Sequence, residues 1–147
     1  MSFPEYVEEL HRAVHALGLF LDARLAGEIS QPEALVIMHL SERSESTVNE
    51  LHHAFLHRRS TLTGVLDRLE SKGLVKRRPA SSDRRTVSVA LTSKGGLVAG
   101  RIAEALDQLR EELERSSHTV KARDRTLLRQ LAEAASVQAD LEHARIR

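Results

Sequence analysis

The stretch RSTLTGVLDRLESKGLVKRRPASSDRRTVSVALT, residues 59–92, carries two hydrophobic periods in succession. Its first half has an apolar stripe at helical spacing and stops at Gly73, a residue typical of helix C-termini. Its second half alternates apolar and small residues at 87–91, which predicts a half-buried strand. Residues 74–78 extend in the same way until Pro79 and the Ser-Ser-Asp cluster break the segment. We therefore predict a helix followed directly by a two-stranded β-ribbon.

Capping residues and apolar periods predict further helices on both sides of this stretch. Thr47, with Glu50 three residues later, has the spacing of a capping box. Ser30 is a second candidate N-cap, and Pro32 suits the first turn of the helix that follows it. The helices expected are 4–25, a segment that begins at Ser30, 47–55, 59–72, about 92–117 and about 121–144.

The two short helices at 47–55 and 59–72 are joined by a few residues, and a ribbon follows the second, which makes a winged helix. The predicted fold class is therefore mainly α, a winged helix-turn-helix with long N- and C-terminal dimerisation helices. Residues 31–92 are expected to form the DNA-binding region. Residues 1–30 and 93–147 are expected to form the dimerisation region of the same compact unit, because their apolar seams exceed what a lone DNA-binding head buries. These seams are residues 7–21, 102–113 and 121–144.

The composition limits the class of protein. Of the 147 residues, 41% are hydrophobic and 29% charged, which is typical of a globular protein with a core. There is no cysteine, which excludes disulfides and thiolate zinc sites. No apolar run approaches the ~20 residues that cross a bilayer, and the start MSFPEYVEEL lacks the features of a signal peptide. We expect no membrane partner and a cytoplasmic location.

Charge is distributed unevenly along the chain. The net charge is +1, but residues 57–85 hold nine Lys and Arg against three acids. A basic block on an otherwise acidic chain is the electrostatic footprint of a nucleic-acid-binding protein. A solvated charged surface is the alternative explanation of the same block.

The outward face of the helix at 59–72 supplies the first candidate DNA contacts. Small hydroxyl side chains lie opposite its apolar stripe and suit hydrogen bonding to base edges and phosphates. Gly64 lies on the same face and removes a Cβ where a partner backbone comes close. The predicted recognition-helix residues are Arg58, Arg59, Ser60, Thr61, Thr63, Gly64 and Arg68. The alternative is that these are ordinary polar surface residues.

The ribbon supplies a second set of candidate contacts. Arg77 and Arg78 lie on the strand that approaches the turn and are expected to reach phosphates. Arg84 and Arg85 lie beyond the turn, where a guanidinium fits the narrow minor groove of A·T-rich DNA. Asp83 is two residues from Arg85, and we predict that its carboxylate orients that guanidinium.

Residues 50–95, ELHHAFLHRRSTLTGVLDRLESKGLVKRRPASSDRRTVSVALTSKG, resemble the MarR family of bacterial winged-helix repressors. The family elements S-T-x-T, R-L-E-x-x-G-L-V-x-R, D-x-R and V-x-L-T-x-x-G appear at 60–63, 68–77, 83–85 and 89–95. Each element is weak alone, but the combined spacing is specific, and the helix order extends the resemblance over nearly the whole chain. The turn before the recognition helix departs from the pattern. Leu56 replaces a common glycine, and His57 and Arg58 replace an apolar residue and a capping serine.

The resemblance implies a homodimeric repressor on double-stranded DNA, with the recognition helix in the major groove and the wing in the minor groove. It also implies release by a small-molecule effector bound between the dimerisation helices and the DNA-binding head. Apolar residues on the first, second and fifth helices suit a small aromatic acid or a phenol, and they equally suit a plain core. No cofactor is expected.

Other functions are weighed against this one. His11 and His15 lie four residues apart on one helix and favour a metal-responsive regulator, although no acidic cluster accompanies them in the sequence. A helical protein-interaction module would self-associate without binding DNA. An enzyme is not expected, because the chain has no glycine-rich phosphate loop and no G-x-S-x-G or H-E-x-x-H sequence. No catalytic or metal site is therefore assigned.

Overall fold

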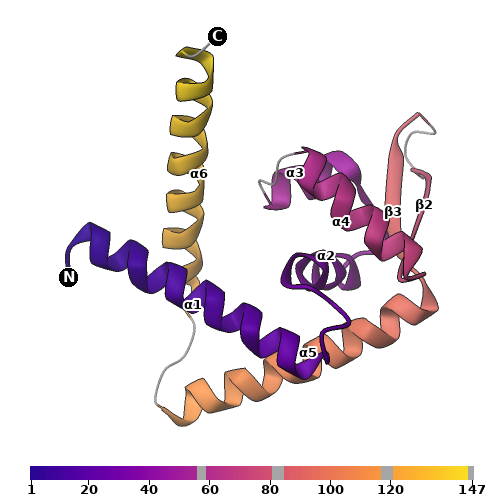
Figure 1. Ribbon diagram of the computed structural model, residues 1–147, viewed down its shortest axis with the longest axis horizontal. Coiled ribbons are helices and arrows are strands. Elements are labelled where there is room, and N and C mark those ends of the chain that lie inside the picture. The colour runs from indigo at the N-terminus through magenta and orange to yellow at the C-terminus, as the bar shows by residue number, and fades with distance from the viewer. Residues whose placement is uncertain (56–58, 81–84, 117–120, 146–147) are drawn as a thin grey trace. The chain divides into compact units, whose positions relative to one another are not determined.

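The computed structural model describes residues 1–55, 59–80, 85–116 and 121–145 (Figure 1). Its mainly α winged helix-turn-helix confirms the predicted fold class, and the predicted helix bounds agree to within two residues. The elements in chain order are α1 (Phe3–Arg24), α2 (Gln31–Ser41), β1 (Ser46–Thr47), α3 (Val48–Phe55), α4 (Arg59–Ser71), β2 (Val75–Pro79), β3 (Val87–Leu91), α5 (Ser93–Arg115) and α6 (Ala122–Arg145).

The chain divides into two compact units, Met1–Gln108 and Leu109–Arg147. The first contains the elements from α1 to β3 and most of α5, and the second contains the end of α5 and α6. In the second unit none of the side chains that the structure describes is buried, and Leu127 is 51% exposed. This unit therefore has no core of its own among its described residues.

Aliphatic side chains form the core of the first unit. In Figure 1, α2 lies beneath α3 and α4, and α2 contacts α1, α4 and β3. Because the protein has few aromatic residues, the interior depends on Leu, Ile and Val. The core includes Leu21, Leu25, Ile37, Leu40, Leu51, Leu62, Leu66, Leu69, Val89 and Ile102.

Three helices begin with a capping box, in which a hydroxyl residue and a glutamate three positions later exchange hydrogen bonds. In each box the glutamate carboxylate accepts a hydrogen bond from the backbone N–H of the hydroxyl residue, at 2.5–2.8 Å. The sequence predicted Ser30 and Thr47 as the N-caps of α2 and α3, and the structure confirms both. The three boxes are Ser2–Glu5, Ser30–Glu33 and Thr47–Glu50.

The sheet contains the predicted two-stranded ribbon, β2 paired with β3, and adds the short strand β1 to it. It has three antiparallel strands in the order β1-β3-β2, with Val89 opposite Ser46 on one side and opposite Arg77 on the other. The predicted alternation along β3 is wrong, because Ser88 and Ala90 are buried while Val87 is 47% exposed. Ser88 is covered on the second face, where its hydroxyl donates a hydrogen bond to Glu45 at 2.9 Å.

The base of the ribbon packs tightly on the start of α5. The Thr92 hydroxyl donates a hydrogen bond to the Gly73 carbonyl at 2.7 Å and accepts one from the Gly95 N–H at 3.1 Å. A Cβ at Gly95 would lie 2.0 Å from the Leu74 carbonyl oxygen, so only glycine permits this approach. The ribbon is therefore fixed to α5 through backbone contact.

Candidate nucleic-acid interface

The recognition helix α4 is held by its apolar stripe. Leu62, Val65, Leu66 and Leu69 are all at most 1% exposed, as the helical period predicted. Gly73 follows the helix with φ of +69°, and the Leu74 N–H bonds back to the Leu69 carbonyl at 2.9 Å. These contacts fix which face of α4 is turned away from the core.

The opposite face of α4 presents small neutral side chains. Ser60, Thr61 and Thr63 are exposed, and Gly64 is partly exposed between them. A Cβ at Gly64 would make ordinary contact with the Arg68 guanidinium at 3.5 Å. Hydroxyls with little side-chain bulk allow a nucleic-acid groove to come close to the helix.

Arg77 connects the wing to the recognition helix. Its guanidinium donates to Glu70 at 2.5 Å and to Asp67 at 2.7 Å, and both acids lie on α4. The hydrogen bond to Asp67, with the charges of both acids, raises the pKa of Arg77. The predicted phosphate contact of Arg77 stays a prediction, and in this structure its guanidinium pairs with two acids of α4.

Two basic residues near the end of α4 pair with a buried carboxylate of α2. Lys72 donates to both carboxylate oxygens of Glu33 at 2.9 Å. The Arg68 Nε lies 3.4 Å from Glu33 Oε1. The predicted DNA contact of Arg68 stays a prediction, and the structure pairs its guanidinium with Glu33 of α2.

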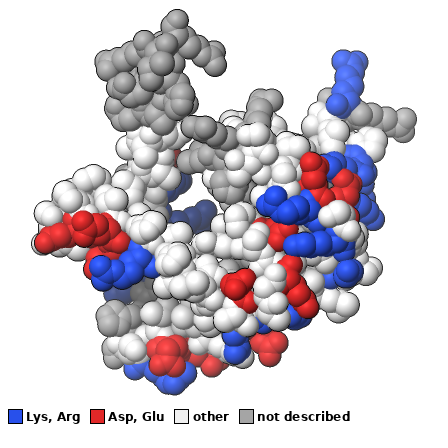
Figure 2. Space-filling view, in the orientation of Figure 1, with Lys and Arg blue, Asp and Glu red and all other residues white. Residues whose placement is uncertain are grey.

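Arg78 is engaged in the same manner on the other side of the wing. Its Nε and Nη2 each lie 3.0 Å from Glu45 Oε2, which also accepts a hydrogen bond from the Ser88 hydroxyl at 2.9 Å. The charged side chains therefore interleave around α4 and the ribbon, and Lys and Arg atoms extend toward the outer end of the ribbon in Figure 2.

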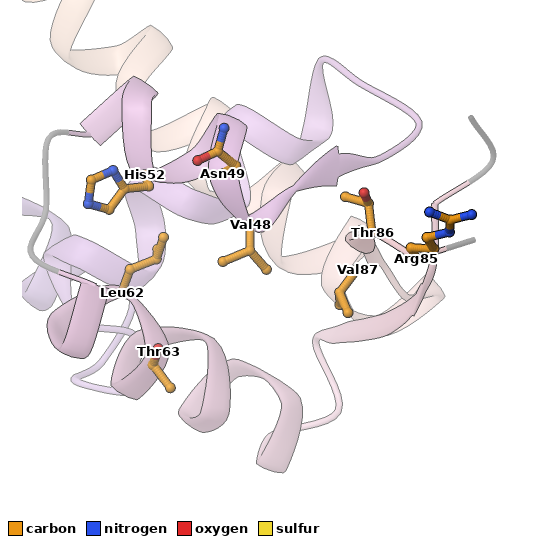
Figure 3. Close-up of a pocket in the computed structure, with 8 residues that line it drawn as sticks. All are labelled: Val48, Asn49, His52, Leu62, Thr63, Arg85, Thr86 and Val87. Carbon is orange, nitrogen blue, oxygen red and sulfur yellow. The ribbon is translucent and has the colours of Figure 1, made fainter. Parts of the chain in front are cut away.

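A hollow of about 410 Å³ lies between α3, α4 and β3 (Figure 3). In Figure 3 His52 and Arg85 lie at opposite ends of the labelled set, with Val48 between them. The sequence did not single out Asn49, which lines the hollow, although the capping box that defines α3 fixes the face on which it lies. The hollow's lining residues are Val48, Asn49, His52, Leu62, Thr63, Arg85, Thr86 and Val87.

Several predicted contacts cannot be placed. Arg58, Asp83 and Arg84 lie outside the described residues, so the predicted orientation of Arg85 by Asp83 stays a prediction. Arg59 is the first residue of α4, and Arg85 is exposed just before β3. Of the predicted set, the structure brings Ser60, Thr61, Thr63 and Gly64 onto one face.

The other candidate sites receive less structural support. The apolar residues of α1, α2 and α5 that suited an effector pocket, such as Leu21, Ile37 and Ile102, pack in the continuous core. His11 and His15 stack with ring centroids 6.4 Å apart, and the described residues contain no group of three potential metal ligands. Among the helices as far as they are described, none is long and apolar enough to span a membrane.

Comparison with known sequences identifies the family. The MarR family model matches residues 29–87. The chain is 33% identical over 112 residues to the HTH-type transcriptional regulator FarR of Neisseria gonorrhoeae, covering 75% of this chain and 74% of FarR. It is 35% identical over 94 residues to TtmR of Methylorubrum extorquens (strain PA1), covering 63% of this chain. That match spans about half of TtmR, 48% of its length.

Solved structures share the fold. BldR from Sulfolobus solfataricus has a TM-score of 0.63 at 26% identity, over 92% of this chain and 99% of BldR. Reduced AbfR bound to DNA has a TM-score of 0.67 at 23% identity, over 92% of this chain and 93% of AbfR. The relatives are named as transcriptional regulators, in agreement with the expectation that the chain is not an enzyme. On its sequence and its fold, this chain belongs to the MarR family of transcriptional regulators.

Proposed function

We propose that the protein binds double-stranded DNA at a pseudo-palindromic operator as a homodimer and represses transcription there. The observation that carries the proposal is the exposed row of Ser60, Thr61 and Thr63 on α4, beside a ribbon with cationic residues. A helix of this kind fits the major groove, and Arg85 near the ribbon tip suits the minor groove. The solved AbfR structure, which has the same fold, contains bound DNA.

The homodimer is proposed from exposed apolar side chains on the long helices. Val7 and Val14 are 43% and 48% exposed on α1, and Leu127 and Leu128 are exposed on α6. Apolar stripes of this length need a partner surface, and a second copy of the chain supplies one. We propose residues 1–30 and 93–147 as the dimerisation region and 31–92 as the DNA-binding region, acting in the cytoplasm.

The effector we propose is a small aromatic acid or phenol rather than an oxidant. The 147 residues contain no cysteine, so a thiol switch is not available within them. Titration with benzoate and phenol is expected to release the DNA, whereas mild peroxide treatment is not. Release by peroxide without oxidation of Met38 would contradict this assignment.

Selection from random duplexes, followed by fluorescence anisotropy, tests the DNA-binding proposal. The recovered sites are expected to be inverted repeats with half-site centres about one helical turn apart. Ser60→Ala and Thr61→Ala are each expected to weaken binding to the selected site by about 1–3 kcal/mol while leaving binding to scrambled DNA nearly unchanged. An unchanged ratio of the two affinities in both variants would show that α4 does not recognise bases.

A further inference from the structure

Glu33 differs from the other capping glutamates of the chain. It is 1% exposed, and it is the only charged residue among those described that is buried. Its carboxylate accepts hydrogen bonds from the Ser30 N–H and hydroxyl at 2.8 and 3.0 Å, which completes the cap of α2. Glu5 and Glu50 perform the same capping role at exposed positions. Capping alone therefore does not require the burial of this carboxylate.

Glu33 also contacts the end of the recognition helix α4. Lys72 donates to both of its oxygens, and Arg68 lies one helical turn earlier against Oε1. Burial alone would raise the pKa of the Glu33 carboxyl, but the hydrogen bonds from Ser30 and Lys72 hold that pKa below its ordinary value. The carboxylate is therefore charged at neutral pH and bridges α2 and α4.

Lys72 and Glu28 make further contacts that connect this ion pair to the neighbouring elements. The Lys72 ammonium also donates to the Glu28 carbonyl in the turn between α1 and α2, at 2.8 Å. The Glu28 carboxylate in turn pairs with Arg101 of α5 at 3.0 Å. The Lys72 carbonyl accepts a hydrogen bond from Lys94 at 2.9 Å. The end of α4 is thus fixed to three other parts of the first unit.

We propose that Glu33 is a positioning residue for DNA recognition: it holds the C-terminal end of α4 so that the first two turns present their hydroxyls to the bases. This inference rests on the proposed function. From Lys72 to Thr61 the helix rises ~16 Å, so a 10° rotation about the anchored end displaces Thr61 by ~3 Å. Hydrogen bonds tolerate only a few tenths of an ångström. An anchor at the far end therefore governs contacts that Glu33 never makes itself.

The proposal and simple charge counting predict opposite effects of Glu33→Gln on the affinity for DNA. Removing a negative charge from the DNA-binding head should tighten binding to any DNA if only the net charge matters. If Glu33 positions α4, Glu33→Gln keeps an oxygen acceptor for the cap, loses the ion pairs, and weakens binding to the selected site alone. Glu50→Gln is the matched control, because it makes the same chemical change at a capping box of the same head.

The experiment compares labelled selected and scrambled duplexes by anisotropy at one salt concentration. Glu33→Gln and Lys72→Met are expected to lose about tenfold in affinity for the selected duplex, with far-UV circular dichroism spectra like that of the parent at the assay temperature. The double variant should lose less affinity than the sum of the two single losses, since both substitutions remove the Glu33–Lys72 ion pair. Lys72→Arg should restore the parental affinity ratio. Tighter binding of both duplexes by Glu33→Gln would overturn the proposal. So would a ratio of selected to scrambled affinity in Glu33→Gln that equals the ratio in Glu50→Gln.

Amide hydrogen exchange separates this inference from the proposed function. In the DNA-free protein, exchange over residues 66–74 is expected to be faster in Glu33→Gln than in Glu50→Gln. If the parent protein binds no duplex, the proposed function fails, whereas unchanged exchange in the variants means that Glu33 does not anchor α4. If Glu33→Gln does not fold, Lys72→Met and Lys72→Arg decide the question, because Lys72 is partly exposed.

Discussion

Gly95→Ala tests the contact that joins the wing to α5. The new Cβ would lie 2.0 Å from the Leu74 carbonyl oxygen and 3.2 Å from Leu91 Cδ2. The oxygen belongs to the backbone, so no rotamer change relieves the overlap. It also accepts a hydrogen bond from the Thr92 N–H at 3.0 Å, so a shift of Leu74 strains that bond.

The expected cost follows from these contacts. Overpacking of this kind costs about 1–3 kcal/mol, and loss of one backbone hydrogen bond adds about 1 kcal/mol. Replacing glycine by alanine in a helix recovers up to about 1 kcal/mol. We therefore expect Gly95→Ala to lower the free energy of unfolding by about 2 kcal/mol, and the melting temperature by about 6 °C in a chain of this length.

Gly100→Ala is the control, because a Cβ at Gly100 meets nothing within 4 Å in the same helix. It should raise the free energy of unfolding by up to about 1 kcal/mol through helix propensity alone. Urea unfolding at a fixed protein concentration measures both variants. Equal stability of Gly95→Ala and Gly100→Ala would show that the backbone approach at Gly95 is not a constraint on the fold.

Three further predictions follow from the charged and apolar residues. The folded-state pKa of Glu33 is lowered, so the stability that its charge contributes is complete above the ordinary pKa of 4.5. That stability is lost as the pH falls through the folded-state pKa. Glu33→Gln should therefore reduce the loss of stability in acid unfolding curves. Arg85→Ala should weaken DNA binding more than Arg78→Ala, most on A·T-rich flanks, because a guanidinium beyond the turn fits the narrow minor groove. Asp83→Ala should also weaken DNA binding, and tighter binding in gel shifts would refute the orienting role. The parent should sediment as a dimer at micromolar concentration and Val14→Glu as a monomer, whereas a monomeric parent would exclude the proposed seam.

Local rules accounted for most of the fold. The helical apolar period and the capping spacing are short-range features, so they predicted α2, α3 and α4 and the buried stripe of α4 from sequence alone. The extra strand β1 has two residues, Ser46 and Thr47, too few for any period to appear. The burial of Ser88 depends on Glu45, which accepts a hydrogen bond from the Ser88 hydroxyl from 43 residues away.

The candidate site was predicted less completely, because ion pairs between distant residues leave no local pattern. The separation between Glu33 and Lys72 is 39 residues, and that between Glu45 and Ser88 is 43. The hydroxyl face of α4 followed from a helical wheel. The ion pairs of Arg68 and Arg77 did not follow from it, because their carboxylate partners become neighbours only in the folded chain.

These ion pairs change what the basic block contributes to DNA binding. Of its nine cations, Arg68, Lys72, Arg77 and Arg78 contact carboxylates in the described structure, which leaves at most five per protomer for phosphates. Each neutralised phosphate contributes about −0.9 to the slope of log K against log salt, so a dimer should show a slope no steeper than about −9. If all nine cations reached phosphates, the slope would approach about −16. A measured slope near the steeper value would mean that the internal ion pairs open on DNA, and that α4 and the wing are rearranged rather than held by them.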